Sequence, residues 1–200
     1  MNDSIYNLEN QNSDLPSKIV VALEKISEAY RVMLWEKSKT YKLSPIQIQI
    51  LVFINSHKSE YCTVSYLAEE FNITKATISD SVKSLLSKNY IEKLENVNDI
   101  RSYLIKLTDT GEELIENLNS YSIQMINPIN DLGSAKQLQL WESLSSIIQN
   151  ISTSNLISMK RMCFTCKHYS KRYDQYYCEL FEQELKQIDI RLDCAEHQAK

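Results

Sequence analysis

Four of the five cysteines in this 200-residue chain lie near its C-terminal end. Cys163 and Cys166 form a C-x2-C pair, and Cys178 and Cys194 follow it. In a reducing compartment, such clustering favours metal binding or redox chemistry over structural disulfides. Two cysteines at this spacing can ligate one metal while backbone N–H groups support the thiolates. We therefore predict that these four cysteines hold one metal centre.

Zinc is the first interpretation of this centre, because a structural zinc would stabilise a segment with too little apolar mass to fold alone. An iron–sulfur cluster uses the same ligand type, and free thiols or disulfide switching are the third interpretation. The second half of the segment lacks another C-x2-C pair, which weakens the zinc interpretation. His168 and His197 are spare candidate ligands. Cys62, the fifth cysteine, is expected to be an ordinary buried residue.

A second group of residues has the chemistry to contact DNA. A helix is predicted over residues 74–88, because Ile78, Val82, Leu85 and Leu86 recur at helical spacing. Its remaining positions carry hydroxyl groups, which suit phosphates or base edges, and lysines, which suit phosphates. The candidate DNA contacts on this helix are Thr74, Lys75, Thr77, Ser79 and Lys83.

The neighbouring elements would position this helix. A short helix over 63–71 precedes it after a tight turn, and a β-hairpin with strands over 90–95 and 102–107 follows it. A short helix, a turn, a longer helix and a hairpin form the winged helix-turn-helix pattern. The second helix of that pattern fits the major groove, and the hairpin reaches a neighbouring groove.

Further helices are predicted on both sides of this unit. One runs over 17–39 with Ser17 as its cap, and another begins at Ser44, where Gln47 completes a capping box. After the hairpin, Thr108 caps a long helix that continues through Tyr121 toward Pro128. The last long helix starts at Ser134, with Gln137 completing its box. Its apolar stripe consists of Leu138, Trp141, Leu144, Ile148 and Ile151.

Composition and charge limit the function classes. Glycine and proline are scarce, which favours a helix-rich chain over a β-sandwich or a glycine-rich nucleotide fold. No signal peptide or membrane span is apparent, so a cytoplasmic location is expected. The net charge is −4, which opposes DNA binding, but the proposed reading unit over 74–107 is mildly basic. No catalytic motif is present, so we expect no enzyme.

The sequence resembles the MarR family of repressors. The resemblance rests on LSPIQIQILVFI, VSYLAEEFNITKATISDSVKSLLSKNYIEKL and NDIRSYLIKLTDTGEEL, and it covers about residues 17–155. Its most specific part is Asp99-x-Arg101 followed by Leu107-Thr108-x-x-Gly111. The resemblance implies that Arg101 lies on the wing and enters the minor groove, while Asp99 holds Arg101 and the wing in shape.

The resemblance also implies a homodimer built from the flanking helices and released from DNA by a small, often aromatic, ligand. Tyr30, Trp35 and Tyr41 lie where such a pocket could form, although aromatic residues at helical spacing are more often core. Two positions depart from the family pattern. Asp80 stands where relatives often carry a basic residue, and Asn89 replaces the usual glycine.

The sequence thus predicts a mainly α fold: a winged helix-turn-helix with long N- and C-terminal dimerisation helices and a small metal-binding tail. The expected function is sequence-specific binding of double-stranded DNA by a homodimeric repressor. A small-molecule effector, or a redox or metal signal at the cysteines, would release the repressor from DNA. The cysteine centre could instead serve only to stabilise the fold of the tail. The alternatives are an iron–sulfur redox protein and a protein-interaction adaptor. The expected units are a disordered arm over 1–14, a dimerisation helix over 15–43, the DNA-binding lobe over 44–107, dimerisation helices over 108–160 and the cysteine module over 161–200.

Overall fold

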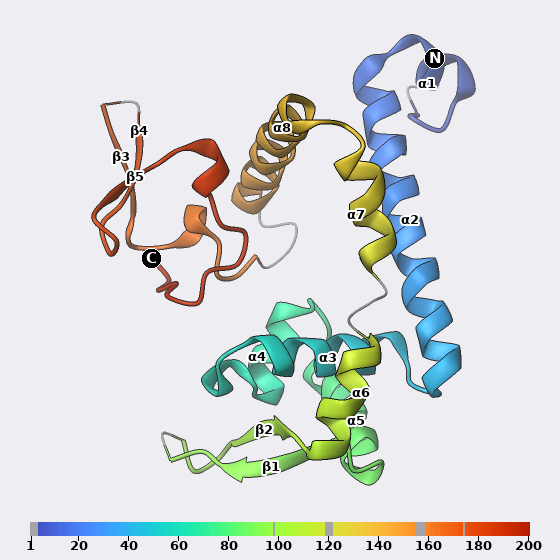
Figure 1. Cartoon of the computed structure of the whole chain (residues 1–200), viewed down its shortest axis with the longest axis vertical. Coiled ribbons are helices and arrows are strands. Elements are labelled where there is room, and N and C mark those ends of the chain that lie inside the picture. The colour runs from blue at the N-terminus through green and yellow to red at the C-terminus, as the bar shows by residue number, and fades with distance from the viewer. Residues whose placement is uncertain (1–3, 98, 119–121, 155–158, 174) are drawn as a thin grey trace.

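A computed structural model describes residues 4–97, 99–118, 122–154, 159–173 and 175–200. Within these ranges the chain is mainly helical, with one two-stranded and one three-stranded antiparallel sheet. Figure 1 shows three parts: a lobe around α3–α6 with the β1–β2 hairpin, the helices α2, α7 and α8, and a C-terminal module that carries β3–β5. No helix among the described residues is both long enough and apolar enough to span a bilayer.

The N-terminal region differs from the prediction in two respects. The predicted disordered arm contains a short helix, α1 (Leu8–Ser13), which Asn7 caps by accepting a hydrogen bond from the Glu9 N–H at 2.9 Å. The next helix, α2 (Leu15–Tyr41), is capped by Asp14 and not by Ser17. Asp14 accepts hydrogen bonds from both the N–H and the hydroxyl of Ser17, at 2.9 and 2.6 Å. A carboxylate three residues earlier therefore takes the cap position.

The helices of the lobe begin where the sequence predicts. The N–H of Ser44 donates to Gln47 Oε1 at 3.0 Å, and the predicted capping box of α3 (Pro45–Ser56) is complete. Thr63 caps α4 (Val64–Glu70), and Thr74 caps α5 (Lys75–Ser87). A short 3-10 turn, η1 (Ser59–Tyr61), joins α3 to α4. The core of the lobe consists chiefly of Ile48, Ile50, Leu51, Leu67, Ile78, Val82, Leu85, Ile105 and Leu118.

The predicted hairpin is present as β1 (Ile91–Glu95) and β2 (Tyr103–Leu107), paired antiparallel with Ile91 opposite Leu107. The middle of β2 is tied to the lobe by the Ile105 N–H, which donates to the Cys62 carbonyl at 2.8 Å. Asn89 adopts the left-handed conformation expected of it, with φ of 58°. The Thr108 hydroxyl donates to the Asn89 carbonyl at 2.6 Å, which fixes the start of the following helix beside β1.

The predicted single helix from Thr108 toward Pro128 is wrong. The structure has α6 (Asp109–Leu118) and α7 (Ile123–Asn130), and Tyr121 lies outside the described residues. Pro128 falls within the last turn of α7, and the helix ends two residues later, as expected from the lost N–H and from the clash of the proline ring with the preceding turn.

The predicted cap of the last long helix is also wrong. Helix α8 (Ser134–Thr153) has Gly133 as its N-cap, without a side-chain hydrogen bond. Gln137 instead donates to the carbonyls of Ile129 and Asn130, at 3.0 and 3.3 Å. The side chain that should have completed a capping box therefore satisfies the open C-terminal end of α7.

The C-terminal module contains η3 (Cys163–Thr165), β3 (Tyr169–Arg172), β4 (Gln175–Cys178), β5 (Gln183–Leu185) and η4 (Gln187–Asp189). It packs on α8: the Trp141 indole N–H donates to the Gln187 carbonyl at 2.8 Å, and the Gln187 amide donates to the buried Ser145 hydroxyl at 2.8 Å. Trp141, predicted as part of a dimerisation stripe, thus contacts the chain's own cysteine module.

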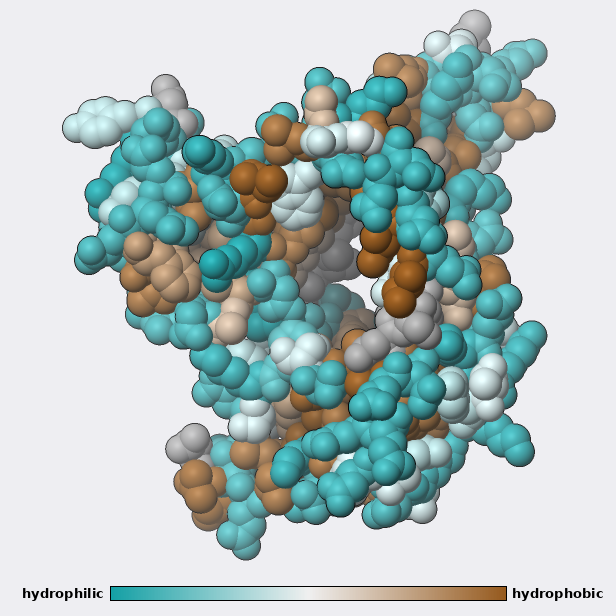
Figure 2. All heavy atoms as spheres, in the orientation of Figure 1, coloured by the Kyte–Doolittle hydropathy of each residue, from teal (hydrophilic) through white to brown (hydrophobic). Residues whose placement is uncertain are grey.

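Apolar side chains remain exposed along the long helices. Met33 is the one buried residue described in α2, and α7 has none among its described residues. Figure 2 shows apolar side chains gathered around the opening between α7 and α8. The exposed large apolar residues of these two helices are Ile123, Ile126, Ile129, Leu138 and Leu140.

Gly111 sits where α6 approaches the hairpin most closely. A Cβ atom at this position would overlap the Tyr90 carbonyl oxygen and would lie 3.2 Å from Leu107 Cδ2. Replacing glycine by alanine within a helix normally stabilises it by about 1 kcal/mol. We expect Gly111→Ala to do the opposite and to lower the free energy of unfolding by about 1–3 kcal/mol, as overpacking does. Chemical denaturation measures this. Thr110→Ala, at an exposed neighbour on α6, is the control, and equal or greater stability of Gly111→Ala would contradict the packing.

Candidate nucleic-acid interface

The predicted DNA-contacting residues of α5 lie on its solvent side. Thr74, Lys75, Thr77 and Lys83 are exposed, and Ser79 is half-buried. The opposite side of α5 is anchored by Ile78, Val82 and Leu85, which are fully buried. The same periodicity that buries one side of the helix therefore presents hydroxyls and lysines on the other.

The start of α5 carries two threonine hydroxyls that contact each other. Thr74 Oγ1 and Thr77 Oγ1 are 2.9 Å apart, and Thr74 Oγ1 also accepts the Thr77 N–H at 3.2 Å. Thr74 therefore has a structural role as the cap. Because both hydroxyls are exposed, each keeps hydrogen-bonding capacity for a phosphate or base edge.

One lysine of the set is paired with an acid on the same helix. Lys83 Nζ lies 3.0 Å from Asp80 Oδ1, and the two side chains are 71% and 76% exposed. An ion pair this exposed contributes little to stability. It does offset the positive charge of Lys83 locally, so α5 presents a more neutral surface than its lysines alone suggest.

The wing holds an arginine in a defined position. Asp99 Oδ1 accepts hydrogen bonds from the backbone N–H of Arg101 at 3.1 Å and from its Nε at 3.3 Å. These bonds, the backbone one first, hold the pKa of Asp99 below its usual value. The Arg101 side chain is 89% exposed. The wing therefore presents a cation whose orientation is restrained by Asp99 and whose guanidinium is open to solvent.

A cleft of about 330 Å³ separates the wing from the start of α4. Thr63 and Ser65 line one side of it, and Asp99, Arg101 and Ser102 line the other. The sequence reasoning missed Ser65, which is exposed in the first turn of α4. The sequence did offer one signal for Ser65, because it is a hydroxyl residue that stands two positions after the Thr63 cap, in the first turn of the predicted helix.

The predicted metal ligands are close in space but do not form a site for a single ion. All four cysteines are free, and all four line one small cavity. Within the described residues, no group of three or more histidine, cysteine, aspartate or glutamate side chains is placed to hold one ion. His168 lines the cavity, whereas His197 Nε2 lies 3.0 Å from the Thr165 hydroxyl.

Cys62 lies apart from this cavity. It is 1% exposed within the core of the lobe, and burial raises the pKa of its thiol to about 11. A thiol with such a pKa stays protonated and unreactive near neutral pH. The prediction that Cys62 is an ordinary buried residue is therefore confirmed.

The aromatic residues considered for an effector pocket separate into two groups. Tyr30 and Trp35 are 41% and 52% exposed on α2, while Tyr41 is partly buried against the core of the lobe. The core interpretation therefore holds for Tyr41 alone.

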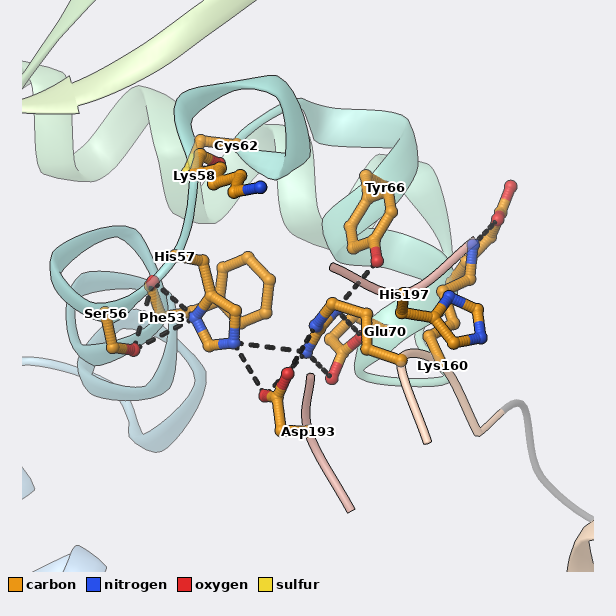
Figure 3. A network of polar contacts seen from close by, with 12 residues as sticks. Phe53, Ser56, His57, Lys58, Cys62, Tyr66, Glu70, Lys160, Asp193 and His197 are labelled. Carbon is orange, nitrogen blue, oxygen red and sulfur yellow. Dashed lines mark hydrogen bonds and ion pairs between the residues drawn. The ribbon is translucent and has the colours of Figure 1, made fainter. Parts of the chain in front are cut away.

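The cysteine module is docked on the lobe by a buried arginine that the sequence did not reveal. Arg161 is 2% exposed. Its Nη1 donates to Glu70 Oε2 at 2.8 Å and to the Tyr66 hydroxyl at 2.7 Å, and its Nε donates to Asp193 Oδ1 at 2.8 Å. Figure 3 shows Glu70 and Tyr66 from α4 converging with Asp193 from the C-terminal segment.

Other groups extend this contact. His57 Nε2 lies 2.7 Å from Asp193 Oδ2, and the His57 ring stacks on Phe53 with 3.8 Å between centroids. Lys58 Nζ lies 2.9 Å from Glu196 Oε1. Burial alone would lower the pKa of Arg161, but hydrogen bonds with Asp193, Glu70 and Tyr66 raise it above its ordinary value. The guanidinium therefore stays charged.

Comparison with known proteins agrees with the winged helix-turn-helix arrangement of the lobe. Residues 41–102 match the model of the MarR family. Over 117 residues the chain is 27% identical to the HTH-type transcriptional regulator BilQ of Clostridioides difficile strain CD3. The alignment covers 58% of this chain and 77% of BilQ. The cysteine module lies outside the family match.

Solved structures show the same fold. The S. aureus MepR–DNA complex is similar over 66% of this chain and 96% of MepR, with a TM-score of 0.56 and 20% identity. A MarR protein from Peptoclostridium difficile DA00132 is similar over 71% of this chain and 90% of its own length, with a TM-score of 0.56 and 21% identity.

The Arg161 contact yields a stability prediction. Arg161→Gln leaves Glu70 and Asp193 without their cation in a partly buried site, so we expect the free energy of unfolding to fall by about 2–4 kcal/mol. Arg172→Gln is the control, because Arg172 pairs with Glu179 at a position where its side chain is 52% exposed, and it should cost less than about 1 kcal/mol. Urea denaturation compares the two variants, and equal losses would show that the Arg161 network is not a major contact.

Proposed function

We propose that this chain, whose residues 41–102 belong to the MarR family, is a homodimeric repressor that binds specific sites in double-stranded DNA. The observation that carries the proposal is the joint exposure of the polar side of α5 and of Arg101 on the wing. The protein also resembles MepR, whose structure is known as a DNA complex.

In this proposal α5 enters the major groove. Residues at the start of a recognition helix reach base edges first, so Thr74, Lys75 and Thr77 supply the first contacts, followed by Ser79 and Lys83. Hydroxyl groups accept or donate at any base edge, and lysines bind phosphates. Ser65, across the cleft from the wing, adds a phosphate contact.

Arg101 enters the minor groove beside the site of α5. Its two hydrogen bonds to Asp99 restrict the side chain before DNA arrives, which reduces the ordering entropy lost on binding. Minor-groove arginines respond to groove width and charge. Asp99 therefore acts as a positioning residue for the wing.

A second copy of the chain covers the exposed apolar side chains of α2, α7 and α8. Soluble monomers rarely leave large contiguous apolar patches open to water. A two-fold dimer would bury these side chains and would place two α5 helices for adjacent turns of one duplex. We also propose that the protein acts in the cytoplasm.

Release from DNA would follow a change in the spacing of the two lobes. A ligand between the long helices and the lobe, beside Tyr30 and Trp35, would favour a spacing that misfits successive major grooves. A change at the four cysteines is the second candidate signal, because Arg161 connects that module to α4.

The wing assignment is tested with Arg101→Ala. We expect weaker binding to a duplex selected from a random library with the wild-type protein, and a salt slope that is smaller by about one, because one cation no longer displaces counterions. Fluorescence anisotropy across salt concentrations measures both quantities. Arg31→Ala, at an exposed position on α2, is the charge-matched control. The wing assignment fails if both variants give the wild-type isotherms.

The dimer is tested with Ile126→Glu, which places a charge among the exposed apolar residues of α7. We expect this variant to sediment as a monomer at concentrations where the wild type is a dimer, because a buried unpaired carboxylate opposes association. Gln124→Glu adds the same charge at an exposed polar position of α7 and should remain dimeric. A wild type that is monomeric by analytical ultracentrifugation would refute the proposal.

A further inference from the structure

The tip of the wing, here defined as residues 96, 97 and 99–102, exposes two large apolar side chains to water. Ile100 is 95% exposed and Val97 is 87% exposed. Both border one surface hollow, together with Ser102. Single exposed apolar residues are common on protein surfaces. Here two of them share the outer end of the element that the proposed function places in a DNA groove.

The backbone of the wing tip explains why these side chains face water. The Asp99 N–H donates to the Asn96 carbonyl at 3.1 Å, and the Ser102 N–H donates to the Asp99 carbonyl at 3.0 Å. Each bond closes a β-turn, and Val97 and Ile100 are the second residues of the two turns. Turns are usually built from glycine, proline, asparagine, aspartate and serine. Turn chemistry therefore does not account for two β-branched apolar residues at these positions.

Polar contacts hold the same turns in place. Asn96 Nδ2 donates to Ser102 Oγ at 2.8 Å, and the Ser102 hydroxyl donates to the Asp99 carbonyl at 3.1 Å. Ile100 directly precedes Arg101, whose side chain Asp99 restrains. Adjacent Cα atoms lie about 3.8 Å apart, close to the spacing of about 3.4 Å between successive nucleotides of one strand. Ile100 can therefore reach the base pair next to the one that Arg101 contacts.

Charge by itself gives the wing tip little attraction for DNA. Its two ionisable side chains are those of Asp99 and Arg101, which pair with each other, so the formal charges cancel. An apolar contact would add binding free energy that this charge does not supply, because hydrocarbon that is now exposed would leave water. The composition of the wing tip thus favours an apolar contact beside a single cation.

The chemistry of the minor groove decides which base pairs tolerate such a contact. A·T and T·A pairs present only acceptors there, whereas a G·C pair adds the amino group on N2 of guanine. A guanidinium can donate to the acceptors, but an isoleucine side chain can accept nothing from the amino group. Burying that donor against hydrocarbon is costly, because it loses its water and gains no partner. An isoleucine beside a minor-groove arginine therefore disfavours G·C pairs.

We propose that Ile100 is a specificity-determining residue of the wing. It contacts the minor groove beside Arg101 and disfavours guanine at that position, so the wing selects A·T pairs. Val97 extends the apolar contact along the groove. This inference rests on the proposed function, because it requires the wing to lie in the minor groove. It goes further by naming the base pair that the wing selects and the side chain that selects it.

The test compares guanine with inosine, which pairs with cytosine but lacks the amino group on N2. The duplex is selected from a random library with the wild-type protein. The wing positions are those whose hydroxyl-radical protection is lost with Arg101→Ala. A·T pairs at these positions are replaced one at a time by guanine·cytosine or by inosine·cytosine, and fluorescence anisotropy measures binding.

For the wild type we expect guanine·cytosine to bind about tenfold more weakly than inosine·cytosine at one wing position, as for one unfavourable base pair. Ile100→Ser should lose most of this difference, because a serine hydroxyl accepts a hydrogen bond from the amino group. The substitution should also leave the salt slope unchanged, since isoleucine displaces no counterions. Ile188→Ser, which removes an isoleucine that is 66% exposed in the cysteine module, is the matched control and should keep the wild-type difference.

The outcomes separate this inference from the proposed function. A wild type that binds the guanine and inosine duplexes equally well overturns the role of Ile100, and so does an Ile100→Ser variant that keeps the full difference. Both results leave the repressor proposal standing. A wild type that binds no duplex from the library overturns the proposed function and this inference together.

Discussion

The ion pairs of the buried Arg161 guanidinium join the cysteine module to the lobe. A charge that is 2% exposed is costly unless it is paired and hydrogen-bonded. Arg161 meets that requirement with Glu70 and Asp193, residues 91 and 32 positions away in the sequence. Its Cζ atom also lies 5.0 Å from the Phe53 ring centroid. The cost of burying this cation is thus offset only when the lobe and the cysteine module are both in place.

The backbone at Arg161 shows the same dependence. Its φ of 59° lies in the left-handed region, which costs a non-glycine residue of order 1–3 kcal/mol. Such a conformation persists where the surroundings determine it. Here the Arg161 carbonyl accepts the Cys194 N–H at 2.8 Å while its side chain reaches Asp193. One residue therefore connects the main chain of the cysteine segment to the side chains of α4.

Local chemistry explains which parts of the fold could be predicted. The capping box at Ser44, the caps at Thr63 and Thr74, and the left-handed Asn89 each depend on a few adjacent residues. One error arose where a more distant partner competed. Gln137 matches the capping pattern but binds the end of α7. The solvent exposure of the α5 residues followed from the helical periodicity of the sequence. Arg161 follows Lys160, and such a pair of cations is normally exposed, so only its contact with Glu70 in the folded chain reveals that it is buried.

Helix α4 is held at both ends by unrelated contacts. Before its N-terminus, the Cys62 carbonyl accepts a hydrogen bond from the Ile105 N–H at the middle of β2. At its other end, Glu70 binds Arg161 of the cysteine module. In Figure 1 the module and the hairpin lie on opposite sides of α3 and α4. A displacement of the cysteine module that carried Glu70 with it would therefore tilt α4 and strain the hydrogen bond between Ile105 and Cys62.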